Sequence, residues 1–154
     1  MYKKMLVPLD ASDFAECVFD HVREIASARA IPEVVLLTVV EPVRPVVYSY
    51  FGDEGMKGAE AAARESAETY LNAVKARLGL ESSNVATVVA NGEPSEEILK
   101  YVNENGVDLV VMSTHGRSGV SKWFLGSVAE RVLRGSTAPV FLVPTIECRA
   151  RVTK

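Results

Sequence analysis

Several residue patterns that would point to a particular chemistry are scarce in this chain. Cysteine occurs only at Cys17 and Cys148, and histidine only at His21 and His115. The two cysteines are too far apart for a zinc-type spacing, and two histidines with scattered carboxylates do not specify a metal centre. No serine–histidine–aspartate or cysteine–histidine set can be assembled from the order of the residues. The sequence therefore indicates neither a metal site nor a catalytic residue.

Long apolar runs and an excess of basic residues are also missing. No stretch approaches the length of a membrane-spanning helix, and the apolar run near the N-terminus is too short for a signal peptide. The formal net charge is −3, whereas general nucleic-acid binding needs a basic face. We therefore expect a cytoplasmic protein that has neither a nucleic-acid partner nor a membrane partner.

The chain does contain enough apolar sequence for a folded domain. Of its 154 residues, 48 % are hydrophobic and 24 % are charged, which is typical of a folded soluble chain. This length suits one domain with a sizeable core. We expect the domain to span 1–146 and to be followed by a polar tail at 147–154.

Short apolar segments alternate with segments of helical periodicity. The apolar segments, which we interpret as strands, are 5–9, 33–40, 84–90, 107–112 and 140–143. The helical segments are 13–29, 58–78, 94–105 and 125–134. Strands that are apolar on both faces and separated by helices indicate a parallel α/β sheet covered by helices on both faces. Ligands of such sheets bind beyond the carboxyl ends of the strands.

The segment 41–57 interrupts this alternation. It contains four expected breakers and three aromatic residues, namely Pro42, Pro45, Gly52, Gly55, Tyr48, Tyr50 and Phe51. We expect an irregular loop, which is long for a connection within a compact domain. A lid or subunit contact and a plain surface excursion are equally compatible with this composition.

A candidate phosphate site follows the fourth strand. The apolar run ending at Met112 opens into a loop that contains Gly116 and Gly119, and a helix begins near Gly126 and Ser127. Glycine lets the backbone approach a ligand, and the free N–H groups of a helix start face an anion. Further donors and positive charge in this loop come from His115, Arg117 and Lys122. The alternative is an ordinary loop whose glycines serve only its turns.

Asp10 ends the first strand and faces the same crevice if the first and fourth strands are neighbours. Its carboxylate could accept hydrogen bonds from ribose hydroxyls, hold a metal, or cap the helix that follows. The loop after the fourth strand lacks the Gly-Lys-Ser/Thr ending of a Walker P-loop. The first strand is likewise not followed by Gly-x-Gly-x-x-Gly, so a dinucleotide fingerprint is excluded.

These segments together resemble the universal stress protein family. Its Gly-x2-Gly-x9-Gly-Ser/Thr motif is matched at Gly116, Gly126 and Ser127, whereas Ser113 stands in place of the first glycine. The opening Met-Leu-Val-Pro-Leu-Asp-Ala-Ser, the turn at 92–98 and the last strand at 138–143 are also similar to the family. The similarity thus extends over the whole expected domain.

The resemblance implies a single-domain, five-stranded parallel sheet of order 3-2-1-4-5, similar to the adenine nucleotide alpha hydrolases. It implies ATP or AMP across the first and fourth strands, with Mg²⁺ possible beside ATP, and a homodimer through strand 140–143. The residues it assigns to the nucleotide, together with the donors noted above, are Pro8, Leu9, Asp10, Val39, Met112, Ser113, His115, Gly116, Arg117, Gly119, Gly126, Ser127 and Val128.

These implications lead us to expect a regulatory protein of the stress response that binds an adenine nucleotide. One alternative is a slow Mg²⁺-dependent ATPase. The other is a nucleotide-free interaction module, which would follow if the side chain of Ser113 closed the pocket.

Overall fold

The computed structural model describes residues 1–42, 45–81, 83–115 and 125–145, and of 45–53 it describes only the backbone. The expected loop residues Gly116, Arg117 and Gly119 therefore lie outside the described residues. The expected tail at 147–154 does so as well. The division into a domain and a tail stays a prediction.

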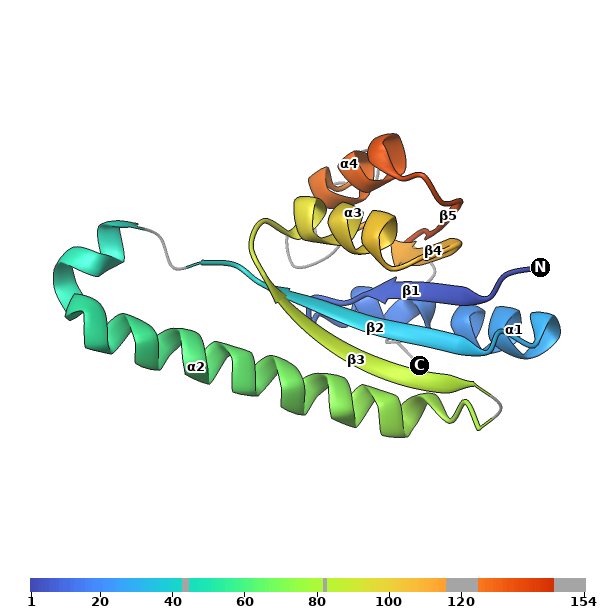
Figure 1. The fold of residues 1–154 in the computed structure, drawn as a ribbon, viewed down its shortest axis with the longest axis horizontal. Helices are drawn as coiled ribbons and strands as arrows, with labels where there is room; N and C mark the ends of the chain where they lie inside the picture. Colours follow the sequence, from blue (N-terminus) through green and yellow to red (C-terminus); the bar gives the residue numbers. More distant parts are fainter. Residues whose placement is uncertain (43–44, 82, 116–124, 146–154) are drawn as a thin grey trace.

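Five parallel strands form one sheet in the order β3-β2-β1-β4-β5 (Figure 1). The strands are β1 (Lys4–Pro8), β2 (Glu33–Val40), β3 (Asn84–Asn91), β4 (Leu109–Ser113) and β5 (Val140–Val143). The helical elements are η1 (Ala15–Val18), α1 (Phe19–Arg29), α2 (Pro45–Leu78), α3 (Pro94–Glu104) and α4 (Ser127–Gly135). The expected fold class and strand order are confirmed.

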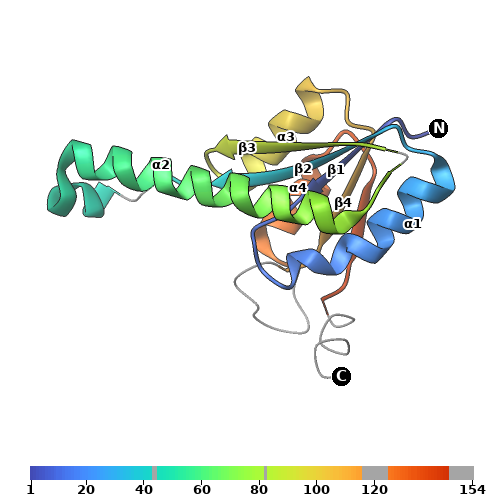
Figure 2. The same cartoon turned by 90° about the horizontal axis from the view of Figure 1, so that it is seen from below.

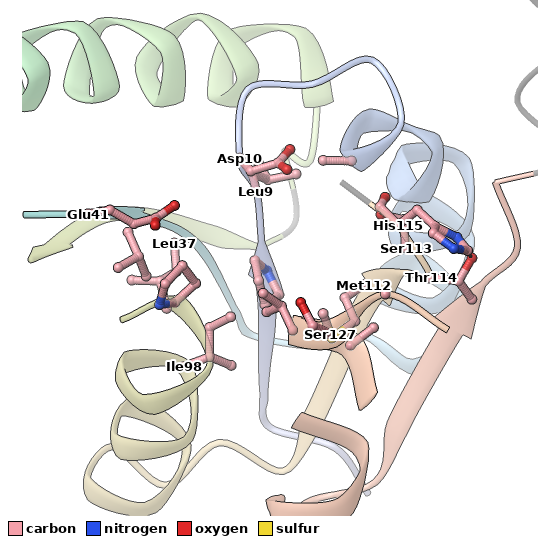
Figure 3. A pocket seen from close by; sticks show the side chains of 17 residues that line it. Leu9, Asp10, Leu37, Glu41, Ile98, Met112, Ser113, Thr114, His115 and Ser127 are labelled. Carbon is pink, nitrogen blue, oxygen red and sulfur yellow. Dashed lines mark hydrogen bonds between the residues drawn. The ribbon is translucent and has the colours of Figure 1, made fainter. Parts of the chain in front are cut away.

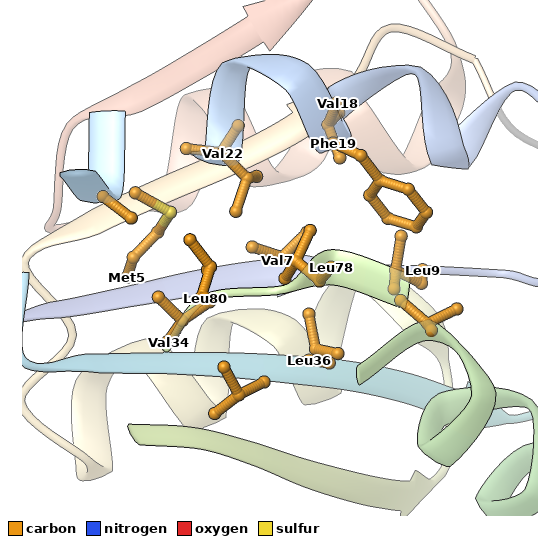
Figure 4. Packing of buried hydrophobic residues seen from close by; sticks show 14 of the residues in the cluster. Met5, Val7, Leu9, Val18, Phe19, Val22, Val34, Leu36, Leu78 and Leu80 are labelled. Carbon is orange, nitrogen blue, oxygen red and sulfur yellow. The ribbon is translucent and has the colours of Figure 1, made fainter. Parts of the chain in front are cut away.

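Alternate side chains of the central strands enter two separate cores, because successive residues of a strand point to opposite faces. One core combines Met5, Val7, Val34 and Leu36 with Val22 of α1 and Leu71 and Leu78 of α2 (Figure 4). The other combines Leu6, Val35 and Leu37 with Ile98 and Val102 of α3 and Val132 of α4. Helices therefore cover both faces, which leaves the carboxyl edge of the sheet as the place for a site.

Helix α2 corrects the expected loop at 41–57. It begins at Pro45 and continues to Leu78, so most of that segment is helical, and Figures 1 and 2 show it projecting beyond the sheet. A proline is tolerated in the first helical turn, and a glycine inside a helix costs only about 1 kcal/mol, so neither residue type forces a break here. Within the described residues, no helix, α2 included, is both long and apolar enough to cross a membrane.

The first helix begins differently from the expectation of a continuous helix over 13–29. Its first turn is a 3₁₀ segment, η1, and the α-helix starts only at Phe19. The N–H of Ala15 donates to the hydroxyl of Ser12 at 3.1 Å, so Ser12 does cap the start of the helical region. The other elements lie within two residues of their expected bounds.

Candidate functional site

A cavity of about 250 Å³ opens at the carboxyl ends of β1, β2 and β4, where the helices η1, α3 and α4 begin (Figure 3). The strands contribute Pro8, Leu9, Asp10, Leu37, Val39, Glu41, Met112, Ser113, Thr114 and His115. The helix starts contribute Ala15, Pro94, Ile98, Gly126, Ser127, Val128 and Ala129.

The cavity brings together every predicted site residue that the structure describes, from Pro8 to Val128. Their segments are far apart in sequence and meet because β1 lies between β2 and β4. Parallel strands end at the same edge of the sheet, so residues that follow neighbouring strands become neighbours in space. The position of Gly116, Arg117 and Gly119 relative to the cavity is outside the described residues.

The helix α3 reaches the cavity with its N-terminus already occupied. Glu93 caps it, accepting hydrogen bonds from the Glu96 N–H at 2.9 Å and the Ser95 hydroxyl at 2.5 Å. Burial alone would raise the pKa of Glu93, but these hydrogen bonds, with the charge of Arg131 nearby, hold it below its usual value. A second anion at this helix start would meet the Glu93 carboxylate and Pro94, which has no N–H.

The start of the first helical region is also occupied, because the Ser12 hydroxyl accepts a hydrogen bond from the Ala15 N–H. Asp10 stabilises the turn that precedes it. Its Oδ1 accepts hydrogen bonds from the Ser12 N–H at 3.1 Å and from the Ser12 hydroxyl at 2.6 Å. The residue between them, Ala11, has a φ of 62°, so the chain turns sharply here. The Asp10 carboxylate therefore stabilises this turn and also lines the cavity, and its contact with a ribose or a metal stays a prediction.

The helix α4 presents an open N-terminus to the cavity. Its N-cap is Gly126, and among the described residues no side chain caps its first turn. The first four N–H groups of a helix have no partner inside the helix, and together with the helix dipole they favour an anion. Ser127 and Val128 carry two of these N–H groups and line the cavity. Of the three helix starts at this edge, α4 is therefore the one suited to a phosphate.

A close backbone contact fixes where α4 begins. The N–H of Gly126 donates to the carbonyl of Thr114 at 2.8 Å, which joins the two ends of the loop at 115–125. A Cβ added at Gly126 would lie 2.8 Å from that carbonyl oxygen, closer than real Cβ atoms approach. Glycine is required here for its lack of a side chain, since its φ of −59° is open to any residue.

Ser113 lies at the end of β4, with 8 % of its surface exposed. Its hydroxyl donates to the carbonyl of His115 at 2.7 Å and so stabilises the turn that leaves the strand. Nδ1 of His115 lies 3.1 Å from the Thr114 hydroxyl, while its buried Nε2 has no hydrogen-bond partner among the described residues. Ser113 lines the cavity without filling it.

Charge is distributed unevenly around the cavity (Figure 3). Asp10 and Glu41 place carboxylates on the β1 and β2 side, whereas His115 and the open start of α4 lie on the β4 side. Apolar side chains, among them Val39 and Met112, line the same cavity. Within the described part of the chain, no group of three His, Cys, Asp or Glu side chains could hold a metal ion. The cavity suits a ligand with an apolar middle, an anionic end at α4 and hydrogen-bond donors at the carboxylates.

The model of the Universal stress protein family matches residues 1–144. The chain belongs to the universal stress protein family. It is 32 % identical to the universal stress protein MJ0577 of Methanocaldococcus jannaschii, over 93 % of this chain and 95 % of that protein. The solved structure of MJ0577 superposes with a TM-score of 0.81 at 33 % identity and covers 94 % of this chain and 96 % of that one.

Two further solved structures of universal stress proteins contain adenine nucleotides. One, in complex with cAMP, has a TM-score of 0.66 at 25 % identity, covering 94 % of this chain and 98 % of that one. The other, from Arabidopsis thaliana with AMP bound, has a TM-score of 0.65 and covers 92 % of this chain and 91 % of that one. The Arabidopsis protein is 15 % identical to this chain, so its similarity supports the fold alone.

Several lining residues of this universal stress protein were missed in the sequence. Glu41 directly follows β2, much as Asp10 follows β1. The position of Glu41 after an apolar run was therefore the signal available in the sequence. Pro94 and Ile98 belong to the first turns of α3, which starts at the carboxyl edge because β3 ends there. Leu37, Thr114, Ala15 and Ala129 had no comparable signal, since only the packing of the elements brings them to the cavity.

Proposed function

We propose that this protein binds an adenine nucleotide, ATP or AMP, in the cavity at the carboxyl edge of its sheet, and acts as a regulatory protein of the stress response. The observation that carries the proposal is one partly apolar cavity lined both by the start of α4, which is uncapped among the described residues, and by the Asp10 carboxylate. The cAMP complex of a universal stress protein that is 25 % identical supports it.

In this proposal the phosphates lie at the start of α4. The N–H groups of Ser127 and Val128 and the ring of His115 would meet them, and the Asp10 carboxylate would accept hydrogen bonds from the ribose hydroxyls. Val39 and Met112 would contact the base. The other proposed site residues are Pro8, Leu9, Ser113 and Gly126, which line the cavity. Gly116, Arg117 and Gly119 are also proposed, and they lie outside the described residues.

The sheet register supports a place for the base at the end of β2. The Leu9 N–H donates to the Leu37 carbonyl, and on the other side of β2 the Gly92 N–H donates to the Val40 carbonyl. Parallel strands direct the polar groups of alternate residues to alternate neighbours. The N–H and C=O of Val39 therefore point to the side that β1 has left, where one edge of an adenine ring would find a donor and an acceptor.

The proposal includes a homodimer formed through β5 in the cytoplasm. This strand is an edge of the sheet, and Phe141 on it is 41 % exposed although it is a large apolar residue. An exposed apolar edge strand is a natural surface for pairing with another chain. Bound nucleotide would then act by shifting the population of conformations that a partner recognises.

The slow ATPase remains the alternative activity. Mg²⁺ is held by one or two carboxylates together with phosphate oxygens, so Asp10 and the Ser127 hydroxyl are the side chains that would meet it. His115 is the candidate for positioning water, because its Nε2 is buried without a partner in the described structure. The nucleotide-free alternative would need Ser113 to close the pocket, and its hydroxyl bond to the backbone does not favour that.

Analysis of released nucleotide, calorimetry of nucleotide binding and an ATP turnover assay test these proposals. Denaturing the purified protein and analysing the released small molecules should yield an adenine nucleotide, or calorimetry should detect binding of ATP or AMP to the empty protein. Ser127→Asp should abolish binding, because a carboxylate then occupies the phosphate position, while its charge at a helix start keeps the fold stable. Ser127→Ala is the matched control and should weaken binding by no more than about tenfold, since the N–H groups remain.

Unchanged affinity in Ser127→Asp would exclude the start of α4 as the phosphate site. For the alternative, turnover of ATP with Mg²⁺ should be compared between the wild type, Asp10→Ala and Ser127→Ala. A regulatory binding protein shows no turnover above background, and a rate that neither substitution alters indicates a contaminating enzyme.

A further inference from the structure

Glu41 is a charged residue of the cavity to which the proposed function gives no role. It lies at the end of β2 and lines the cavity together with Leu37 and Val39 of the same strand. Figure 3 shows it on the β2 side, across the cavity from Ser127 and His115. A carboxylate beside an apolar slot accepts hydrogen bonds only, so it favours a ligand that presents a donor there.

Whether Glu41 favours or disfavours binding depends on which groups the base presents to its carboxylate. A 6-amino purine presents an amino group with two hydrogens beside an acceptor nitrogen. A 6-oxo purine presents an acceptor oxygen beside an N–H group. The Val39 carbonyl can accept one amino hydrogen, which leaves the second hydrogen for the Glu41 carboxylate. The oxygen of a 6-oxo purine would instead lie against that negative charge.

We propose that the Glu41 carboxylate is the residue that selects bases carrying an exocyclic amino group and rejects their 6-oxo counterparts. This inference rests on the proposed nucleotide site and specifies which base that site takes. A site that offers a hydrogen-bond acceptor discriminates strongly against a ligand that also presents an acceptor there, because neither group gains a hydrogen bond and the two repel each other. Glu41 is exposed to solvent, so we expect a contribution of about tenfold in affinity and not more.

The test is the ratio of the dissociation constants of ITP and ATP, measured by calorimetry on the full chain. The two nucleotides share phosphates and ribose and differ in the edge of the base, so the ratio isolates base recognition. The Val39 backbone by itself favours adenine, so the wild-type protein should prefer ATP whatever Glu41 does. The contribution of Glu41 is therefore measured by comparing the ITP/ATP ratio of the wild type with that of a Glu41 variant. Glu41→Gln replaces one acceptor oxygen by an amino group that can donate to the 6-oxo oxygen.

In Glu41→Gln the ratio should fall about tenfold towards one, mainly because ITP binds better. Glu104→Gln is the matched control, since it removes the same charge from an exposed position at the far end of α3, and it should leave the ratio unchanged. Glu41→Ala should also lower the ratio, because ATP loses a hydrogen bond and ITP no longer meets the negative charge, but ITP gains no new donor as it does in Glu41→Gln.

A ratio that stays the same in Glu41→Gln while ATP still binds overturns the role of Glu41 and leaves the nucleotide site intact. Absence of ATP and AMP binding in the wild type overturns the proposed function and this inference with it. An equal fall of the ratio in Glu104→Gln also overturns the inference, because the effect would then come from net charge and not from the position of Glu41.

Discussion

Replacing Gly126 by alanine tests the contact that joins the two ends of the loop at the start of α4. The added Cβ would lie 2.8 Å from the Thr114 carbonyl oxygen and 3.5 Å from the Cα of His115. Both neighbours are backbone atoms, which cannot turn away as a side chain can. The backbone angles at Gly126 suit alanine, so the strain comes from this contact alone.

The size of the effect follows from how far the backbone must move. The Thr114 carbonyl has to retreat by roughly half an ångström to reach ordinary contact distance, which lengthens the hydrogen bond it accepts from the Gly126 N–H. Overpacking of this kind costs about 1–3 kcal/mol in the free energy of unfolding. For a domain of this size, we expect Tm to fall by about 3–10 °C.

The same movement should weaken nucleotide binding, because the N–H groups of Ser127 and Val128 shift with the start of the helix. We expect the affinity for ATP to fall by at least about tenfold, as positioned hydrogen-bond donors lose their alignment. Thermal unfolding by circular dichroism gives Tm, and calorimetry gives the dissociation constant of ATP for the folded variant.

Two other glycines of the same chain serve as controls. A Cβ at Gly135, at the other end of α4, also meets an atom at 2.8 Å, but that atom is the end of the flexible side chain of Leu99. A Cβ at Gly58, inside α2, meets nothing within 4 Å. Gly135→Ala should change the free energy of unfolding by less than about 1 kcal/mol, and Gly58→Ala should raise it by about 0.5–1 kcal/mol.

The reasoning is refuted if Gly126→Ala keeps the wild-type Tm and the wild-type affinity for ATP. It is also refuted if Gly135→Ala is destabilised as strongly as Gly126→Ala. In that case the contact distance, and not the rigidity of the atom contacted, would decide the cost.

Three further predictions concern other parts of the molecule. Phe141→Asp should convert the proposed dimer into a monomer in sedimentation, whereas Leu133→Asp, also at an exposed apolar residue, should not; an unchanged mass in both contradicts pairing through β5. Glu93→Gln should cost about 1 kcal/mol at pH 7 and less below about pH 4, because a carboxyl whose folded pKa is depressed stabilises only above its unfolded pKa. A difference in the free energy of unfolding that stays constant with pH would contradict the depressed pKa. Burial, with the charge of Glu16 nearby, raises the pKa of Tyr70, so the folded protein should lose stability above about pH 10. Tyr70→Phe should lose less, and urea unfolding at a series of pH values measures both.

The sheet could be predicted from the sequence because its signals are local. Residues 5–9, 33–40 and 140–143 are apolar on both faces, and the helices between them have regular periodicity, so the parallel arrangement follows from the pattern. The family motif then implied the strand order and the nucleotide. Gly126 and Ser127 were recognised in this way before their contacts were known.

The start of α2 could not be predicted in this way. Pro45 is the first residue of the helix, where proline is tolerated, and Gly52 and Gly55 inside it cost only about 1 kcal/mol each. The propensities were real, but they were too small to decide the conformation of the segment. Element boundaries depend on such small differences far more than the existence of an element does.

By itself, then, the sequence determined the fold class, the order of the elements and the residues that end each strand, since these depend on periodicity and on residue type. Only the tertiary structure decided which of the three helix starts lacks a side-chain cap among the described residues. It also decided that the Ser113 hydroxyl turns to the His115 carbonyl and that Glu41 lines the cavity. The physical reason is that a cap, a hydroxyl direction and a shared cavity depend on atoms brought together from distant segments, which no local pattern records.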